Sequence, residues 1–215
     1  MIIAFDGNVF SGKTSFIAGF CGSAKCVVVP EHSHFVADFR SHEDAWSVQQ
    51  KYLDAEVKRH VYLLGMPSER LILVDRSFVS MAAHVWALYT TQGVDMRARF
   101  LGRVTRGIRS NWITLPNQFC HVVCDYPLIR ARAAIDVVKR TDRFYMDENY
   151  LKAVDAFNRK WQIHFPGCLI DTSTEESAKA SQQALVQHLR AVDQPQHDTE
   201  ACCRRMEELL MRPRL

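Results

Sequence analysis

The sequence predicts an α/β fold in which helices cover a parallel β-sheet. Two observations support this prediction: short apolar runs alternate with longer amphipathic stretches, and a glycine-rich loop follows the first apolar run. Short runs without polar alternation are typical of strands that are buried on both faces. Strands that alternate with helices favour a parallel sheet, because parallel strands are joined by crossover connections.

We expect five strands, each a short and mostly apolar run. In chain order they cover residues 2–5, 26–29, 71–74, 120–124 and 168–170. The segments between them have the length and periodicity of helices. Met96, Phe100, Val104 and Ile108 recur every four residues, which places them on one helix face. Pro127 suits a first helical turn. Helices are therefore expected at 15–20, 44–64, 77–89, 95–108, 127–138, 148–163, 174–191 and 200–211.

The composition indicates one globular domain and gives no sign of a nucleic-acid or membrane partner. The chain has 215 residues, of which 47% are hydrophobic and 24% charged. A net charge of +3 is too small to argue for nucleic acid or a membrane surface as partner. We expect no transmembrane helix and no signal peptide, because the chain lacks the long apolar runs that both require. These features predict a cytoplasmic protein.

The cysteines and the end of the chain add two expectations. The seven cysteines are odd in number and form no C-x-x-C pair, so reduced thiols are the simplest interpretation. Residues 192–199 are polar and contain a proline, which indicates a linker. The expected organisation is one domain over 1–191, followed by a linker and tail helix over 192–215.

The most specific motif lies at residues 7–14, which have the pattern G-x-x-x-x-G-K-T of a phosphate-binding loop. The expected strand before it and helix after it are the context that this motif needs. Backbone N–H groups of such a loop, together with the helix N-terminus, point at phosphate oxygens. Lys13 would then reach the β and γ phosphates, and the Thr14 hydroxyl would bind Mg²⁺.

A carboxylate follows the second expected strand. In open α/β sheets the ligand crevice lies beyond the carboxyl ends of the strands, so Glu31 is a candidate base for a substrate hydroxyl. The alternative is a strand-end glutamate in solvent. His32 and His34 follow, and because no third metal ligand is evident we expect them in a solvated loop.

The third expected strand ends in Asp75-Arg76-Ser77. Asp75 can hold Mg²⁺ through water, and Arg76 can bind phosphates or clamp an acceptor. Ser77 is a plausible N-cap. The alternative is a capping turn with an incidental Asp–Arg pair.

A basic run lies between the fourth and fifth strands; its members are Arg130, Arg132, Lys139, Arg140 and Arg143. On a continuing helix, Arg132, Lys139 and Arg143 would share one face, and a polyphosphate would relieve their repulsion. Alternatively, Asp136 pairs with Arg132 or Arg140. We expect residues 139–147 to form a lid over the nucleotide.

Two weaker candidates remain. The helix expected at 44–64 carries Gln50 and Arg59, which could contact a base edge, although a solvated face explains them equally well. The segment Asp171-Thr172-Ser173, after the last strand, could contact an adenine through backbone groups or could only cap the next helix.

With these motifs in hand, the chain resembles the thymidylate kinase and deoxynucleoside kinase superfamily of P-loop kinases over residues 1–191. The resemblance depends on GNVFSGKTS, VVVPE, LILVDRS, RARAAIDVVKRTDRF and LIDTS, in this order. It implies a three-layer fold with a five-stranded parallel sheet in the order 2-3-1-4-5, flanked by helices and completed by a lid. It also implies ATP as donor, Mg²⁺ as cofactor, a small-molecule phosphoryl acceptor and a homodimer.

The resemblance assigns roles residue by residue. Glu31 matches the base of the deoxynucleoside kinases, Asp75 and Arg76 match the acid–arginine pair of the third strand, and Arg132 and Arg143 match lid arginines. Gln50, with Tyr52 two residues on, resembles the base-reading glutamine region. The implied donor-binding residues are Gly7, Asn8, Ser11, Gly12, Lys13, Thr14, Ser15, Arg132 and Asp171.

The sequence leaves the acceptor open between a nucleoside and a nucleoside monophosphate. The phosphate loop has no acid and the third motif is DRS, which favours nucleoside kinases, whereas TDRF resembles thymidylate kinase lids. One alternative keeps the fold but phosphorylates a non-nucleoside small molecule. The other is a regulatory ATPase that binds partners through its tail helix.

Overall fold

The computed structural model describes residues 1–23, 26–36, 43–67, 70–135, 146–165, 167–191 and 197–211. Its centre is a five-stranded sheet in the order β2-β3-β1-β4-β5, and every neighbouring pair of strands is parallel. The strands are β1 (Ile2–Gly7), β2 (Cys26–Val29), β3 (Leu71–Asp75), β4 (Gln118–Val123) and β5 (Leu169–Asp171). The number, direction and order of the predicted strands are confirmed.

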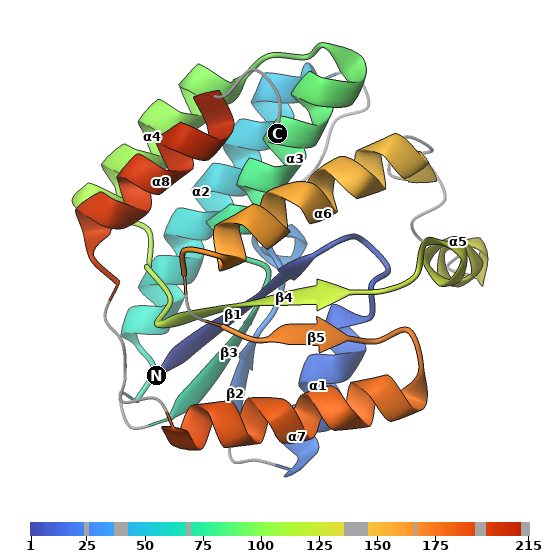
Figure 1. The fold of residues 1–215 in the computed structure, drawn as a ribbon. Helices are drawn as coiled ribbons and strands as arrows, with labels where there is room; N and C mark the ends of the chain where they lie inside the picture. The colour runs from blue at the N-terminus through green and yellow to red at the C-terminus, as the bar shows by residue number, and fades with distance from the viewer. Residues whose placement is uncertain are drawn as a thin grey trace.

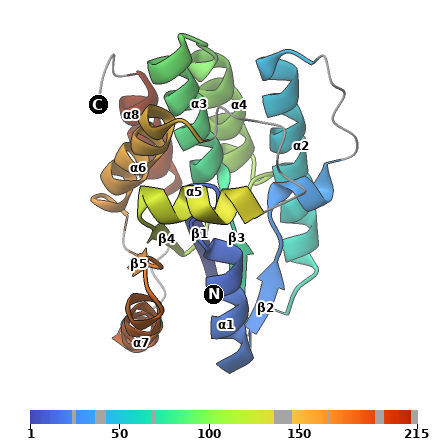
Figure 2. The same ribbon diagram turned by 90° about the vertical axis from the view of Figure 1, so that its right-hand side faces the viewer.

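Helices cover both faces of the sheet (Figure 1). On one face lie α1 (Lys13–Ser23) and α7 (Glu175–Ala191). Against the other face pack α3 (Phe78–Gln92) and α6 (Glu148–Gln162), with α2 (Ala45–Leu64), α4 (Arg97–Arg109) and α8 (Thr199–Met211) around them. Two shorter elements, the 3-10 helix η1 (His32–Phe35) and α5 (Tyr126–Ile135), follow β2 and β4. Figure 2 shows α5 crossing the carboxyl ends of the strands.

The helix predictions are confirmed within a few residues at each end, as expected for boundaries that depend on capping. Asp44 caps α2 by accepting hydrogen bonds from the backbone N–H groups of Trp46 and Ser47. Ser77 caps α3, as predicted, by accepting from Val79 N. The helix predicted at 127–138 is described only as far as Ile135.

Two apolar cores fix the layers. The core between the sheet and α1 and α7 contains Phe5, Ile17 and Ile170. The larger core lies on the other face, where Phe78, Phe119 and Trp161 meet edge to face. Together the two cores hold the strand ends in place, which positions the loops that follow them.

The tail helix α8 belongs to the larger core. Met206, Leu209 and Leu210, its predicted apolar side, are fully buried, and so is Cys202. In Figure 1, α8 lies along α4, and its contacts are mainly with that helix. The apolar face of α8 is therefore buried inside the protein, while the domain boundary at residue 191 stays a prediction.

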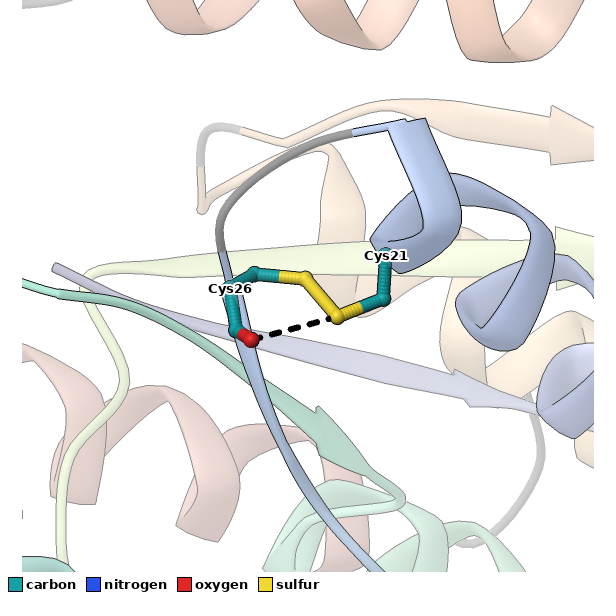
Figure 3. Close-up of a disulfide and its surroundings, with 2 residues drawn as sticks. All are labelled: Cys21 and Cys26. Atoms are coloured by element: carbon teal, nitrogen blue, oxygen red, sulfur yellow. Dashed lines mark hydrogen bonds between the residues drawn. A yellow bond between two sulfur atoms is a disulfide. The ribbon is translucent and has the colours of Figure 1, made fainter.

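The expectation of reduced thiols throughout is wrong for one pair. Cys21, at the end of α1, and Cys26, at the start of β2, form a disulfide (Figure 3). Their Cα atoms lie 5.6 Å apart, within the range that a disulfide spans. The other five cysteines are free, and four of them are buried. Sequence spacing did not indicate this pair, because the distance depends on how α1 packs beside β2.

Among the residues that the structure describes, no helix has both the length and the apolar character needed to cross a bilayer.

Candidate active site

The phosphate loop between β1 and α1 has the backbone that its glycines predict. Gly7 has a φ of 146°, and a Cβ atom at this position would lie 2.2 Å from the carbonyl oxygen of Val122. Gly12 has a φ of 87°. Phe10 also adopts a positive φ, 57°, which is unfavourable for a bulky residue. The loop is therefore held in a strained, curled conformation beside β4.

Lys13 is folded into this loop. Its ammonium group donates hydrogen bonds to the carbonyl oxygens of Gly7 and Asn8 and to the Ser11 hydroxyl. Burial, and then the positive charge of Arg76, lower the pKa of Lys13 from 10.5 to about 7. Among the residues that the structure describes, no carboxylate forms an ion pair with Lys13, and phosphate oxygens would supply an anionic partner.

Thr14 and Asp75 meet as the predicted metal site requires. The Thr14 hydroxyl donates to Asp75 Oδ2 at 2.6 Å. The other carboxylate oxygen, Asp75 Oδ1, is buried and has no hydrogen-bond partner among the described residues. Hard oxygen donors of this kind suit Mg²⁺, which keeps several of its waters. These residues therefore fit a magnesium ion, which would neutralise charge on bound phosphates.

Glu31 and Arg76 form an ion pair at the same edge of the sheet. Arg76 Nε donates to Glu31 Oε2 at 3.0 Å, and Arg76 Nη1 lies 3.4 Å from the carbonyl oxygen of Gly7. Ser33 donates to the other Glu31 oxygen, Oε1. The side chains of Glu31 and Arg76 are each 21% exposed, so both can meet a substrate. Arg76 has a φ of 63°, a conformation that side chains rarely adopt and that is common at functional sites.

Arg132 joins the loop to the end of β5. It donates from Nη1 to the carbonyl oxygen of Phe10 and from Nη2 to that of Thr172. The Thr172 hydroxyl in turn donates to the carbonyl oxygen of Ser11. Arg132 lies on α5, the helix that crosses the strand ends in Figure 2. Its two hydrogen bonds thus connect α5 with the phosphate loop and with the turn after β5.

A cavity of about 680 Å³ is lined by most of these groups, although Asp75 is not among its lining residues. The predicted residues that line it are Gly12, Lys13, Thr14, Ser15, Glu31, Arg76 and Arg132. Thr172 and Ser173, which the sequence suggested as backbone contacts for an adenine, also line it. Sequence reasoning missed Phe10, Phe16, Thr174, Glu175, Ala178 and Gln182. Thr174 and Glu175 could have been suspected, because the segment after β5 begins at this edge of the sheet. Ala178 and Gln182, on a helix face, carried no such signal.

Other predicted residues take different positions. The Asn8 side chain points away from the cavity and donates to the carbonyl oxygen of Leu151 and to Asp155 Oδ1. Asp171 accepts from the backbone N–H of Ser173, so its carboxylate supports the turn after β5. Gln50 is partly exposed on α2 and is not among the cavity residues. Gly7 and Ser11 act by holding Lys13.

Arg143 and most of the predicted lid lie outside the described residues, as do Lys139 and Arg140. Of the lid, the structure describes Met146 and Asp147. Asp147 caps α6 by accepting from the backbone N–H groups of Asn149 and Tyr150. This part of the predicted lid is therefore the start of a helix.

The structure corrects the expectation for His32. It is 2% exposed and lies 2.8 Å from Glu56 and 2.7 Å from Arg59, rather than in a solvated loop. Burial and the charge of Arg59 lower the pKa of His32. His34 is exposed, as predicted. Among the described residues, no group of three potential metal ligands is found around either histidine.

Arg59 also differs from its predicted role as an acceptor contact. Its side chain is 1% exposed and donates to Glu56 and to the carbonyl oxygen of Arg76. A side chain turned into the protein in this way supports the site from behind. Helical periodicity could not distinguish this orientation, because α2 carries polar residues around much of its circumference.

Two polar groups, Asp6 buried in β1 and His84 half-buried on α3, gave no sequence signal. Asp6 accepts hydrogen bonds from Ser77 and Ser80 and thereby ties β1 to the start of α3. His84 lies 2.7 Å from the Tyr150 hydroxyl, and burial together with the charge of Arg76 lowers the pKa of His84 to about 4. His84 is therefore neutral at pH 7.

The arrangement suits charge stabilisation of a polyphosphate. Lys13, Arg76 and Arg132 bring three basic side chains to one cavity, beside the curled loop. Glu31 places a carboxylate in the same cavity, where it can accept a proton from a hydroxyl. Positioning and electrostatics are the main requirements of phosphoryl transfer.

Comparisons with known proteins give structural matches only. No protein-family model matches the chain, and no curated protein sequence matches it. Among solved structures, deoxyadenosine kinase from M. mycoides with bound dATP aligns with a TM-score of 0.62 at 13% identity, over 89% of this chain and 100% of that one. The same enzyme with dCMP and dCDP aligns at 0.63 and 14%, with the same coverage.

Thymidylate kinase from Candida albicans aligns with a TM-score of 0.65 at 10% identity, over 91% of this chain and 96% of that one. These matches span nearly the whole length of each partner, so they concern the complete fold and not only the phosphate loop. The chain therefore has the fold of the deoxynucleoside and thymidylate kinases, the P-loop kinases that the sequence motifs resemble.

Proposed function

We propose that the protein is an ATP- and Mg²⁺-dependent kinase that transfers the γ phosphate to a small nucleoside or nucleoside monophosphate. The observation that carries this proposal is that one cavity contains both Lys13 and Thr14 of the phosphate loop and the Glu31–Arg76 pair. Binding a triphosphate requires only Lys13 and Thr14. Glu31 and Arg76 add a carboxylate and a guanidinium that an acceptor can contact.

Within this proposal, a hydroxyl acceptor is favoured over a phosphate acceptor. Arg76 is already paired with the Glu31 carboxylate at 3.0 Å. The pair therefore has little net positive charge with which to bind an incoming monophosphate. A carboxylate is instead suited to take the proton of an alcohol. The 5′-hydroxyl of a nucleoside is therefore the first acceptor to test.

The test is a panel of nucleosides, nucleoside monophosphates and simple sugar alcohols, each incubated with the protein and Mg-ATP. We expect ADP and a phosphorylated nucleoside in equal amounts, identified by chromatography and phosphorus NMR. Lys13→Ala is the matched inactive control, since it loses both the charge and its contacts within the loop. ADP formation that is independent of every acceptor would contradict a kinase, and phosphorylation of the sugar alcohols alone would support the non-nucleoside alternative.

The packing of α8 weighs against the regulatory ATPase that acts through its tail. The residues that such a helix would offer to a partner, including Met206 and Leu209, are fully buried against the domain. The homodimer that the resemblance implies and the cytoplasmic location expected from the sequence features remain part of the proposal.

A further inference from the structure

Arg59 lies behind the candidate active site, on α2, and bonds to both segments that carry the Glu31–Arg76 pair. Its Nη1 atom lies 2.7 Å from His32 Nε2, and His32 directly follows Glu31. Its Nη2 atom donates to the carbonyl oxygen of Arg76 at 2.7 Å and lies 3.4 Å from that of Asp75. One rigid guanidinium thus connects the end of β2 with the end of β3.

The environment of Arg59 indicates that these contacts are maintained. Arg59, Glu56 and His32 are 1%, 5% and 2% exposed. Glu56 Oε2 lies 2.9 Å from Arg59 and 2.8 Å from His32, so it balances the buried charge of the guanidinium. Buried charges that are paired and hydrogen-bonded in this way are costly to rearrange.

Arg59 bonds to a strained part of the backbone, at Arg76. Arg76 has a φ of 63°, and a side chain in this conformation persists only where its surroundings enforce it. The bond from Arg59 to the Arg76 carbonyl supplies such a constraint. This turn also directs the Arg76 side chain toward Glu31 and Gly7.

We propose that Arg59 is a positioning residue, which holds Glu31 and Arg76 in their mutual geometry by binding η1 and the backbone of Arg76 at the same time. Arg59 itself is not among the residues that line the cavity. This inference rests on the proposed kinase function for its kinetic consequence, but its structural consequence is independent of that function.

The experiment compares the wild-type protein with Arg59→Lys and with Arg103→Lys. Lysine keeps the charge beside Glu56. Its single ammonium group, however, cannot reach His32 and the carbonyl oxygen of Arg76 at the same time, as the planar guanidinium does. Arg103 provides the matched control, because it also pairs with a carboxylate of α2, Asp54 at 2.6 Å, but is 46% exposed and is not among the cavity residues. Arg59→Met is added as a variant that removes the charge.

For Arg59→Lys we expect an unchanged fold by circular dichroism and an affinity for a non-hydrolysable Mg-ATP analogue within about twofold of wild type. A crystal structure should show Arg76 out of the positive-φ region and the contact to Glu31 lost. The kcat for phosphoryl transfer should fall about 100-fold, a typical loss when reacting groups are misplaced by about 1 Å. The KM for ATP should not change, and Arg103→Lys should match wild type.

An Arg59→Lys structure with Arg76 and Glu31 unmoved would overturn the proposal, and so would an equal loss of kcat and of ATP affinity. If Arg59→Met does not fold, the Arg59→Lys variant still tests the positioning role. If the wild-type protein phosphorylates no acceptor, the proposed function fails, whereas the crystal structure and the analogue affinity continue to test the positioning role.

Discussion

The Thr14 hydroxyl donates to Asp75 Oδ2 across 2.6 Å, so the end of the phosphate loop meets the end of β3. The second oxygen of Asp75 is buried without a partner among the described residues. A buried, unpartnered carboxylate oxygen is unfavourable unless a cation or water completes it. This pair is therefore where we expect the metal dependence of the protein to arise.

Asp75→Asn should raise the Mg²⁺ concentration that gives half-maximal phosphoryl transfer. The amide removes the negative charge but keeps the shape, and loss of a residue that orients a metal and its waters costs about 10–100-fold in affinity or activity. The measurement is a magnesium titration at saturating ATP. Asp54→Asn, at an exposed carboxylate on α2, is the control, and an unchanged titration for Asp75→Asn would exclude Asp75 from the metal site.

ATP binding should be accompanied by proton uptake at pH 8. In the free protein the pKa of Lys13 is about 7, so the side chain is mostly neutral at pH 8. Phosphate charge raises this pKa, so about one proton should be bound for each ATP. Calorimetry in two buffers of different ionisation enthalpy measures the uptake. Lys13→Met should abolish it, and equal heats in both buffers for the wild type would contradict the prediction.

The same shift predicts the pH dependence of the stability of the free protein. Because the folded pKa of Lys13, about 7, lies below the ordinary lysine pKa of 10.5, the unfolded chain binds more protons between these limits. The contribution of Lys13 to the free energy of unfolding should therefore rise from pH 7 to 10.5. In urea titrations, the difference in the free energy of unfolding between the wild type and Lys13→Met should therefore shift in favour of the wild type as pH rises from 7 to 10.5, and a constant difference would contradict the prediction.

Glu31→Gln should reduce kcat far more than it reduces ATP affinity. The amide can still contact Arg76 but cannot take a proton, and loss of a general base typically costs about 10²–10⁴-fold in rate. Steady-state kinetics and analogue calorimetry measure the two effects. A comparable loss of both would show that Glu31 serves mainly to hold Arg76, to which it is bound at 3.0 Å.

Gly7→Ala should destabilise the protein by roughly 3–5 kcal/mol, the range of overpacking combined with backbone strain. A Cβ atom there would lie 2.2 Å from the Val122 carbonyl oxygen, at a φ of 146°. Gly22→Ala is the matched control, because a Cβ at Gly22 meets no atom within 4 Å and lies in α1. That control should stabilise α1 by about 0.5–1 kcal/mol through helix propensity. Denaturant unfolding distinguishes the two, and equal stability of both variants would contradict the prediction.

The sequence by itself determined the elements and the edge at which the site lies. Apolar runs located all five strands, because a buried strand must be apolar regardless of its neighbours. The phosphate loop and the residues directly after β2 and β3 were identified for the same reason, since a parallel sheet brings its carboxyl ends to one edge. Lys13, Thr14, Glu31 and Arg76 accordingly line one cavity.

The tertiary structure alone decided where the buried polar side chains point. Arg59 and His32 each resembled surface or substrate residues in the sequence, yet they bind each other behind the site. Asn8 lies in the loop motif but bonds to Asp155 on α6, and Cys21 pairs with Cys26. Periodicity reports only how apolar a helix or strand face is, whereas a polar side chain is directed by partners brought close by the packing of distant segments.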